Sequence, residues 1–215
     1  MKIATIEETG EVVEQGTRDW FMARLGKVTA SEIHNVVTKG KLIAAKGDGY
    51  IKHLAAEICL GEPIDTGDTV WTERGTEMEL PSIRWYEWER QVDVQRVGFI
   101  ESDCGRFGCS PDGLIGEDGG LEAKNPSLVV HTGYLIDDDA LYEDHFLQCQ
   151  FGLYVTKRKW WDLMSFNDTL PSVIVRCLPD PTVFAAFDKC LPPFLARLDA
   201  AVAKIEARRS LNPFQ

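Results

Sequence analysis

The sequence lacks the features that would assign it to a membrane, secreted or repeat protein. It has no apolar run of membrane-spanning length, no internal repeat and no low-complexity tract. Its first 15 residues, MKIATIEETGEVVEQ, show neither the apolar core nor the cleavage pattern of a signal peptide. We therefore expect a cytoplasmic protein that makes no membrane contact. Its 215 residues, 44% of them hydrophobic, suit a single domain spanning 1–215.

The sequence also has few closely spaced cysteines, and its basic residues are fewer than its acidic residues. Only Cys104 and Cys109 of the six cysteines lie close together, so no zinc pattern is complete and we expect ordinary reduced thiols. The net charge of −11 argues against a nucleic-acid partner, because phosphate contacts need lysine and arginine. The segment from Arg18 to Lys52 is nevertheless net basic. An acidic body with a local basic site would give this pattern, and so would a solvated loop.

The order of the expected elements is typical of a mixed α+β domain with a central mixed β-sheet flanked by helices. Thr17 is expected to cap the first helix, and Thr29 with Glu32 fits a capping box that starts a second helix near Ala30. Pro192 and Pro193 are expected to interrupt the last helix. The remaining helices are expected within 47–61, 72–90, 137–156 and 180–209, and strands within 92–100, 106–115, 120–125, 159–166 and 172–178.

The stretch CSPDGLIGEDGGLEAKN, residues 109–125, has the composition of a β-hairpin with chemistry at its open end. The turn residues GEDGG would bring DGLI back against LEAK, with Glu122 and Lys124 on one face and Ala123 on the other. A hairpin of this length places Asp112 near that end. Two carboxylates and an ammonium can bind Mg²⁺, activate water and stabilise charge on a phosphate. The alternative is a surface salt bridge that contributes little.

Other polar residues have a functional and a structural interpretation. Gln150 lies on an apolar helix stripe, where it makes either a core hydrogen bond or a site contact. Glu79 is either a third inward carboxylate or a solvated one. Arg24, Thr29 and Ser31 surround a helix start, which indicates a phosphate site or simple capping. The histidines show no metal-binding spacing and are interpreted as structural or surface residues: His34, His53, His131 and His145.

Several short motifs of the sequence, taken together, resemble those of a known nuclease family. SPDG, a turn and LEAKNP resemble the core of the PD-(D/E)xK nucleases, which implies a restriction-endonuclease-like fold. RLGKVTASEIHNVV, GTEME (75–79) and LQCQFGLYVT followed by WWDLMSF narrow the resemblance to the bacteriophage lambda exonuclease family, the YqaJ-type viral recombinases. The resemblance runs from about residue 15 to residue 166.

The resemblance implies a Mg²⁺-dependent exonuclease, with Mn²⁺ as a substitute, that acts on linear double-stranded DNA with a 5′-phosphate. Such an enzyme degrades one strand from 5′ to 3′ and leaves a 3′ single strand for a single-strand annealing protein. It also implies a homotrimeric ring that threads DNA, of phage or prophage origin, in the cytoplasm of a bacterial host.

By the same resemblance, Asp112, Glu122 and the backbone carbonyl of Ala123 should bind the metal, and Lys124 should assist the attacking water. Glu79 should lie in the outer sphere of the metal or bind a second ion.

Gln150 should contact the water or the DNA near the scissile bond. Arg24, Ser31 and Ser110, with Thr29 beside them, match the family's pocket for the 5′-phosphate. The loop around Leu42 and Ile43 falls where the family carries apolar wedge residues.

Two other functions remain open from the sequence. A PD-(D/E)xK endonuclease would share the core but would also cut closed circular DNA. A non-catalytic DNA-binding recombination adaptor would bind DNA without a Mg²⁺-dependent product.

Overall fold

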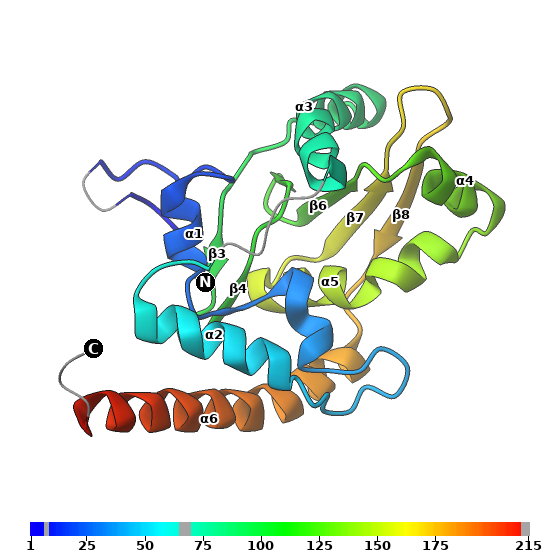
Figure 1. Cartoon of the computed structure of the whole chain (residues 1–215). Coiled ribbons are helices and arrows are strands. Elements are labelled where there is room, and N and C mark those ends of the chain that lie inside the picture. Colours follow the sequence, from blue (N-terminus) through cyan, green and yellow to red (C-terminus); the bar gives the residue numbers. More distant parts are fainter. Residues whose placement is uncertain (7–8, 65–69, 212–215) are drawn as a thin grey trace.

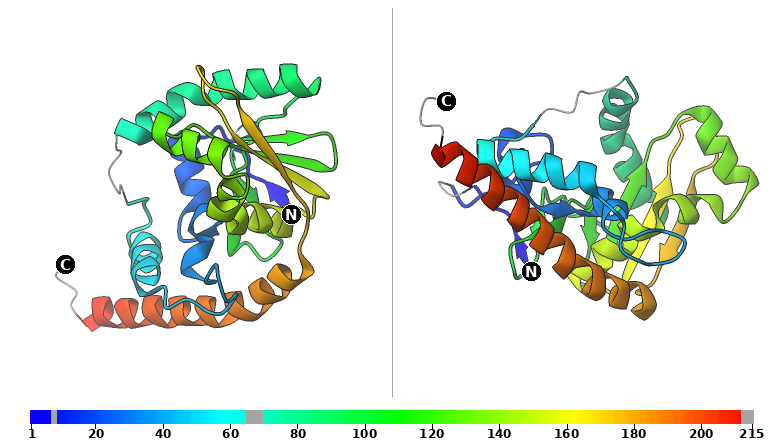
Figure 2. Two further views of the ribbon diagram at one scale, coloured as in Figure 1. Left: turned by 90° about the vertical axis from the view of Figure 1, so that its right-hand side faces the viewer. Right: turned by 60° about the horizontal axis from the view of Figure 1, so that its bottom comes forward.

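Two four-stranded sheets form the framework of the molecule, and helices cover them (Figures 1 and 2). The computed structural model describes residues 1–6, 9–64 and 70–211, with the backbone alone for 70–77. The helices are α1 (Arg18–Arg24), the 3₁₀ helix η1 (Ala30–Asn35), α2 (Asp48–Leu60), α3 (Val70–Arg90), α4 (Leu128–Ile136), α5 (Ala140–Thr156) and α6 (Pro181–Leu211). The strands are β1 (Lys2–Ile3), β2 (Val28–Thr29), β3 (Ile100–Glu101), β4 (Phe107–Cys109), β5 (Gly113–Ile115), β6 (Gly119–Lys124), β7 (Trp160–Ser165) and β8 (Val173–Cys177).

The expected mixed α/β class is confirmed, but the single central sheet is replaced by two. The first sheet has the order β1-β3-β4-β2, in which only β2 and β4 run parallel. The second has the order β5-β6-β7-β8, with a parallel pair, β6 and β7, between two antiparallel pairs. The chain leaves the first sheet after Cys109 and enters the second at Gly113. Pro111 lies between them, and a proline cannot donate to a strand ladder.

Helices α3 and α5 cover opposite faces of the second sheet (Figure 1). Because side chains alternate along a strand, Leu121 of β6 points to the α3 side, where it packs with Ile83 and Tyr86. Glu122 points to the other side, where it meets Gln148 of α5. Strand β6 thus has one apolar face, towards α3, and one face that carries polar side chains, towards α5.

Helix α5 lies at the centre of the larger core. Its buried residues include Leu147, Phe151 and Leu153, and it contacts η1, β4, β7, β8 and α6. Phe151 packs edge-to-face on Phe187 of α6, with ring centroids 5.1 Å apart. A helix buried on most sides is held rigidly, so the polar side chains it carries are well positioned.

Helix α6 continues through Pro192 and Pro193, so the expected interruption is wrong. It runs beside α2 along one side of the molecule (Figure 2). Both prolines are exposed, whereas the flanking Leu191 and Phe194 are buried. The burial of these neighbours offsets the backbone hydrogen bonds that the prolines remove.

One local prediction is confirmed and two are corrected. Thr17 caps α1 through a bond from the Trp20 amide, as expected. Gly61, at φ 75°, ends α2. The predicted capping box is wrong: η1 does start at Ala30, but Thr29 makes no side-chain capping bond. The strand expected over 92–100 is reduced to β3 and an isolated bridge from Gln95. Within the described residues, no helix is long and apolar enough to cross a membrane.

Close packing of β6 against α5 and β7 generates a stability prediction. A Cβ at Gly120 would lie 2.2 Å from the Trp161 ring, so Gly120→Ala should lower the free energy of unfolding by about 1–3 kcal/mol. Gly133→Ala is the matched control, because that helical glycine is exposed and has open space around it; its stability should stay equal or rise by about 0.5–1 kcal/mol. Urea unfolding measures both, and an unchanged Gly120→Ala protein would contradict the packing described.

Candidate active site

The open end of the β5–β6 hairpin is fixed by a side chain. The amide of Asp112 donates to the Leu121 carbonyl at 3.1 Å, and the Ala123 amide donates to Asp112 Oδ2 at 2.6 Å. The Asp112 carboxylate therefore adds one hydrogen bond to the β5–β6 pair, just before β5 begins at Gly113. This hydrogen bond places Asp112 beside Glu122, as the hairpin prediction required.

Glu122, Lys124 and Gln148 form a closed set of hydrogen bonds on the α5 side of β6. Lys124 Nζ donates to Glu122 Oε1 at 2.7 Å and to Gln148 Oε1 at 3.1 Å. Gln148 Nε2 donates to the same Glu122 oxygen at 2.6 Å. The Glu122 side chain is only 8% exposed and that of Lys124 is 25% exposed, so these are not freely solvated surface charges. The interpretation as a surface salt bridge does not fit this geometry.

The charges of the cluster act on one another. Burial and the neighbouring negative charge of Glu122 raise the pKa of Asp112 well above its ordinary value, while Lys124 and the Ala123 amide act in the opposite direction. Burial lowers the pKa of Lys124, but attraction to Glu122 and Asp112 outweighs it, so the pKa is raised. Two carboxylates face one ammonium here, which leaves an excess of negative charge.

Glu79 reaches the same neighbourhood from α3. Its carboxylate forms an ion pair with Arg96, and its negative charge contributes to the raised pKa of Asp112. Residues 75–77, which open the predicted GTEME motif, lie outside the side chains that the structure describes.

Gln150 does not join this cluster; the glutamine of α5 that contacts Glu122 and Lys124 is Gln148. Gln150 is fully buried, donates to the Leu178 carbonyl at 2.7 Å and accepts from the Asp180 amide at 2.9 Å. It ties α5 to the connection between β8 and α6. Residues two apart on a helix point in nearly opposite directions, which explains why only one glutamine faces β6. The core hydrogen bond weighed from the sequence is the interpretation that the contacts support.

The residues predicted to bind the 5′-phosphate fall into two groups, and contacts hold the members of each group together. Arg24 lies over the Trp20 ring at 3.9 Å from the centroid, and the Trp20 indole donates to Ser110 Oγ at 2.9 Å. Thr29 Oγ1 lies 3.3 Å from Ser31 Oγ. Among the hydrogen bonds and ion pairs of the described residues, none involves the Arg24 guanidinium. Arg24 is half-buried, and a cation without an acceptor among the described residues is suited to an anionic ligand.

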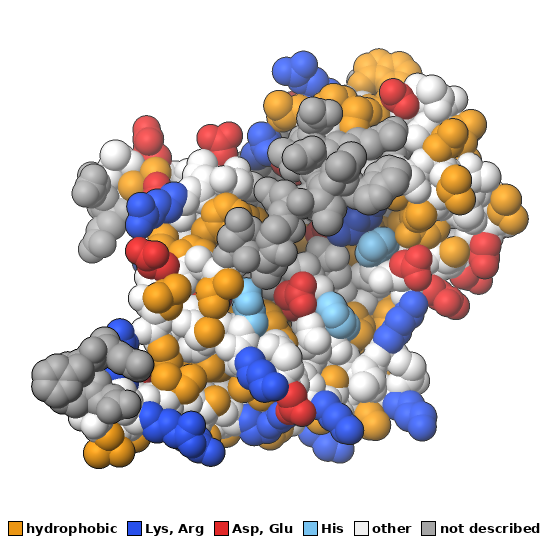
Figure 3. All heavy atoms as spheres, viewed as in Figure 1, with side chains coloured by type: hydrophobic (Ala, Val, Ile, Leu, Met, Phe, Trp, Pro, Cys, Tyr) orange, Lys and Arg blue, Asp and Glu red, His pale blue; other side chains and the backbone are white. Residues whose placement is uncertain are grey.

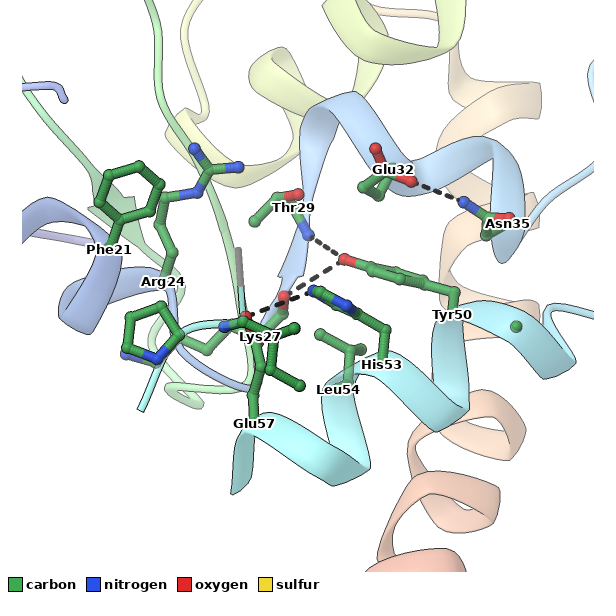
Figure 4. Close-up of a pocket in the computed structure, with 13 residues that line it drawn as sticks. Phe21, Arg24, Lys27, Thr29, Glu32, Asn35, Tyr50, His53, Leu54 and Glu57 are labelled. Atoms are coloured by element: carbon green, nitrogen blue, oxygen red, sulfur yellow. Dashed lines mark hydrogen bonds and ion pairs between the residues drawn. The ribbon is translucent and has the colours of Figure 1, made fainter. Parts of the chain in front are cut away.

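A cavity of about 580 Å³ lies between α1, η1 and α2 (Figure 4). Arg24 and Thr29 form part of its wall, together with Phe21, Glu32 and Tyr50. The Tyr50 hydroxyl accepts a bond from the Thr29 amide at 3.1 Å, which fixes the start of η1.

A second, smaller cavity of about 140 Å³ connects η1 with the cluster. Ser31, Lys39, His145 and Gln148 are among its lining residues. Burial and the charge of Lys124 lower the pKa of His145 to about 4, so this imidazole is neutral at neutral pH. The sequence pattern predicts a structural or surface role for His145, whereas this residue lines the cavity, three residues before Gln148 on α5.

The loop expected to carry wedge residues is a tight turn in the described chain. The Thr38 amide donates to the Ile43 carbonyl at 2.8 Å, Leu42 packs on the core and Ile43 is exposed. Lysine and arginine side chains gather over α2 and α6 on the face shown in Figure 3.

The donor set fits a magnesium-type ion. No group of three or more His, Cys, Asp or Glu side chains in the described parts of the chain could hold a metal by itself. Mg²⁺ needs only one or two carboxylates, because water and substrate oxygens complete its shell. Asp112 and Glu122 supply two. The carbonyl of Ala123 should share the strand edge of its own amide, which points to Asp112.

Comparison with known proteins agrees with the fold and gives the family. Residues 19–159 match the model of the YqaJ-like viral recombinase domain. The alkaline exonuclease LHK-Exo of Laribacter hongkongensis is 32% identical, with a TM-score of 0.80 over 90% of this chain and 98% of that chain. Its structure in complex with dAMP gives a TM-score of 0.81 at the same identity and coverage. No match was found among the curated proteins.

A phage-related exonuclease from Haemophilus somnus 129PT is similar in fold alone, at 12% identity. Its TM-score is 0.67 over 83% of this chain and 96% of that chain. The family model and the 32% identical structures define a nuclease of the alkaline exonuclease class. The chain belongs to the YqaJ-like viral recombinase family, which confirms the family and the enzyme class predicted from the motifs.

Substitution of Gln148 and Gln150 tests the different roles of these two glutamines of α5. Gln150→Ala should lower the free energy of unfolding by about 1–3 kcal/mol, because it leaves the Leu178 carbonyl and the Asp180 amide without their partner. Gln148→Ala should cost less, because Glu122 keeps its bond from Lys124. Urea unfolding of the two variants measures the difference, and the reverse order would show that the roles were exchanged.

Proposed function

We propose that this chain is a Mg²⁺-dependent exonuclease that degrades one strand of linear double-stranded DNA from 5′ to 3′. The observation that carries the proposal is the convergence of Asp112, Glu122, Lys124 and Gln148 at one end of β6. Two carboxylates, an ammonium and an amide in a partly buried site suit hydrolysis of a phosphodiester.

Asp112, Glu122 and the Ala123 carbonyl would hold the metal, with Mn²⁺ as a substitute. When bound, the ion supplies charge stabilisation at the phosphate and lowers the pKa of a water molecule. Glu79, already paired with Arg96, would act from the outer sphere.

Lys124 and Gln148 orient the nucleophile. Lys124 Nζ already donates to Glu122 and Gln148, so its remaining donor capacity has a fixed direction. Water adds to the scissile phosphorus and the bond from phosphorus to the 3′ oxygen breaks. The released mononucleotide carries a 3′-hydroxyl, and the shortened strand carries a new 5′-phosphate.

Arg24, Ser31, Ser110 and Thr29 would bind the 5′-terminal phosphate. The Arg24 guanidinium is the charged contact, and Trp20 lies between it and Ser110. Each cut creates a phosphate that rebinds here, which gives the reaction its direction. The dAMP complex of the Laribacter enzyme supports a nucleotide ligand.

The remaining product would be a 3′ single strand for a single-strand annealing protein, and a homotrimeric ring would keep the enzyme on the duplex. The resemblance to the family supports both, together with action in the cytoplasm of a bacterial host. The net charge of −11 is compatible with DNA in a channel lined by basic residues.

Substitution of Lys124 tests the mechanism. Lys124→Ala should reduce digestion of linear 5′-phosphorylated duplex in Mg²⁺ by about a hundredfold or more, because the water loses its orienting cation. Lys159→Ala is the control, since that lysine is 74% exposed and pairs only with Asp118. Wild-type protein should leave a covalently closed circle intact. Unchanged digestion by Lys124→Ala would remove the mechanism, and cleavage of the circle would favour an endonuclease.

The raised pKa of Asp112 predicts a pH-dependent response to metal. In the metal-free protein Asp112 holds its proton more tightly folded than unfolded, so this stabilisation is present at acidic pH and is lost as pH rises through the raised pKa. Mg²⁺ competes with that proton, and should raise the melting temperature more at about pH 8 than at about pH 5. Asp112→Asn should abolish the difference. An equal Mg²⁺ effect at both pH values would contradict metal binding by Asp112.

A further inference from the structure

The segment that carries Asp112 from the first sheet to the second passes through a buried proline. Strand β4 ends at Cys109 and β5 begins at Gly113, with Pro111 between them. A proline has no amide proton, so this crossing can be held at Pro111 only through its carbonyl. A buried carbonyl needs a hydrogen-bond donor from the protein.

Gln15 supplies that donor from the N-terminal segment. Its side-chain Nε2 donates to the Pro111 carbonyl at 2.8 Å and to the Val97 carbonyl at 3.2 Å. A glutamine amide nitrogen carries two protons, so these two bonds use its whole donor capacity. One side chain therefore joins the crossing to the chain that leads into β3.

The Pro111 carbonyl and the Asp112 amide belong to the same peptide group. The carbonyl accepts from Gln15, and the amide donates to the Leu121 carbonyl of β6 at 3.1 Å. Because a peptide group is planar, bonds at both of its polar groups fix the orientation of the whole plane. The Asp112 side chain leaves the backbone at the next atom, so these two bonds restrict the directions that its carboxylate can take.

The segment around Gln15 is itself held in place. Val13 is 2% exposed, and its amide donates to the Ala4 carbonyl at 3.1 Å. A Cβ at Gly98 would lie 2.0 Å from the Val13 carbonyl oxygen, so this segment packs directly on the backbone next to Val97. A side chain that is fixed in this way can orient the group it contacts.

We propose that Gln15 is a positioning residue, which directs the Asp112 carboxylate towards the cation that Asp112 and Glu122 would share. This inference rests on the proposed function, because the cation belongs to that function. Removal of a residue that orients a metal ligand typically lowers metal affinity or activity about ten- to a hundredfold. A glutamine that only tied the N-terminal segment to the sheet would affect stability and leave metal affinity unchanged.

Amide hydrogen exchange of the full chain, followed by NMR in EDTA, tests the orientation without metal. Gln15→Ala should speed exchange of the Asp112 and Ala123 amides about tenfold relative to the other amides of β6. Gln15→Met should have the same effect, because methionine has a side chain of similar length and no donor.

Thr17→Ala is the matched control, because it weakens the same segment without removing a bond to Pro111. The Thr17 hydroxyl donates to the Glu14 carbonyl and accepts from the Trp20 amide. Loss of this cap should lower the melting temperature and leave exchange at Asp112 unchanged relative to β6.

Mn²⁺ titration of the same proteins, measured by the EPR signal of the free ion, tests the consequence for the site. Both Gln15 variants should bind Mn²⁺ about tenfold more weakly than wild type, and Thr17→Ala should bind it as wild type does. Unchanged exchange at Asp112 and Ala123 in both Gln15 variants would overturn the positioning role. So would unchanged Mn²⁺ affinity in those variants, or an equal loss in Thr17→Ala.

The proposed function fails separately from this inference. A wild-type protein that binds no Mn²⁺, or that binds it and digests no DNA, would lose the exonuclease. The exchange measurement, made without metal, would still decide whether Gln15 orients Asp112.

Discussion

The hydrogen bond from the Ala123 amide to the Asp112 carboxylate is the contact on which the site depends. It fastens the segment that leaves the first sheet to a strand of the second, at the place where backbone pairing with β5 has ended. The bond brings Asp112 against Glu122 at the cost of crowding two negative charges, and the raised pKa of Asp112 is the consequence. Lys124 offsets part of this repulsion. A divalent cation would offset the rest, so the raised pKa of Asp112 and the predicted affinity for metal have the same origin.

Helix α5 contributes to both the stability of the core and the candidate active site. One of its glutamines, Gln150, holds the β8–α6 connection in the core, and the other, Gln148, bonds to Glu122 and Lys124. The same helix carries His145 into the small cavity next to Ser31. The 3₁₀ helix η1 contributes to both cavities, through Glu32 to the larger one and through Ser31 to the smaller one.

Local patterns in the sequence predicted the parts of the site that are local in the chain. The alternation of a strand placed Glu122 and Lys124 on one face, and the turn residues after Ile115 returned the chain to Asp112. Relations between distant segments were not predictable in this way. An apolar stripe marks Gln150 as inward-facing, but only the packing of Leu178 and Asp180 shows that its amide is already satisfied. The division into two sheets and the continuity of α6 through Pro192 likewise depend on tertiary packing.

The central claim is that Asp112 and Glu122 share one divalent cation. A crystal of the protein soaked with Mn²⁺ and a short 5′-phosphorylated DNA duplex, measured by anomalous diffraction, tests it most directly. The account predicts an anomalous peak bound by both carboxylates and by the Ala123 carbonyl, on the side of β6 that carries Lys124. A peak bound by only one of the two carboxylates, or a well-ordered DNA end with no cation at either, would contradict it.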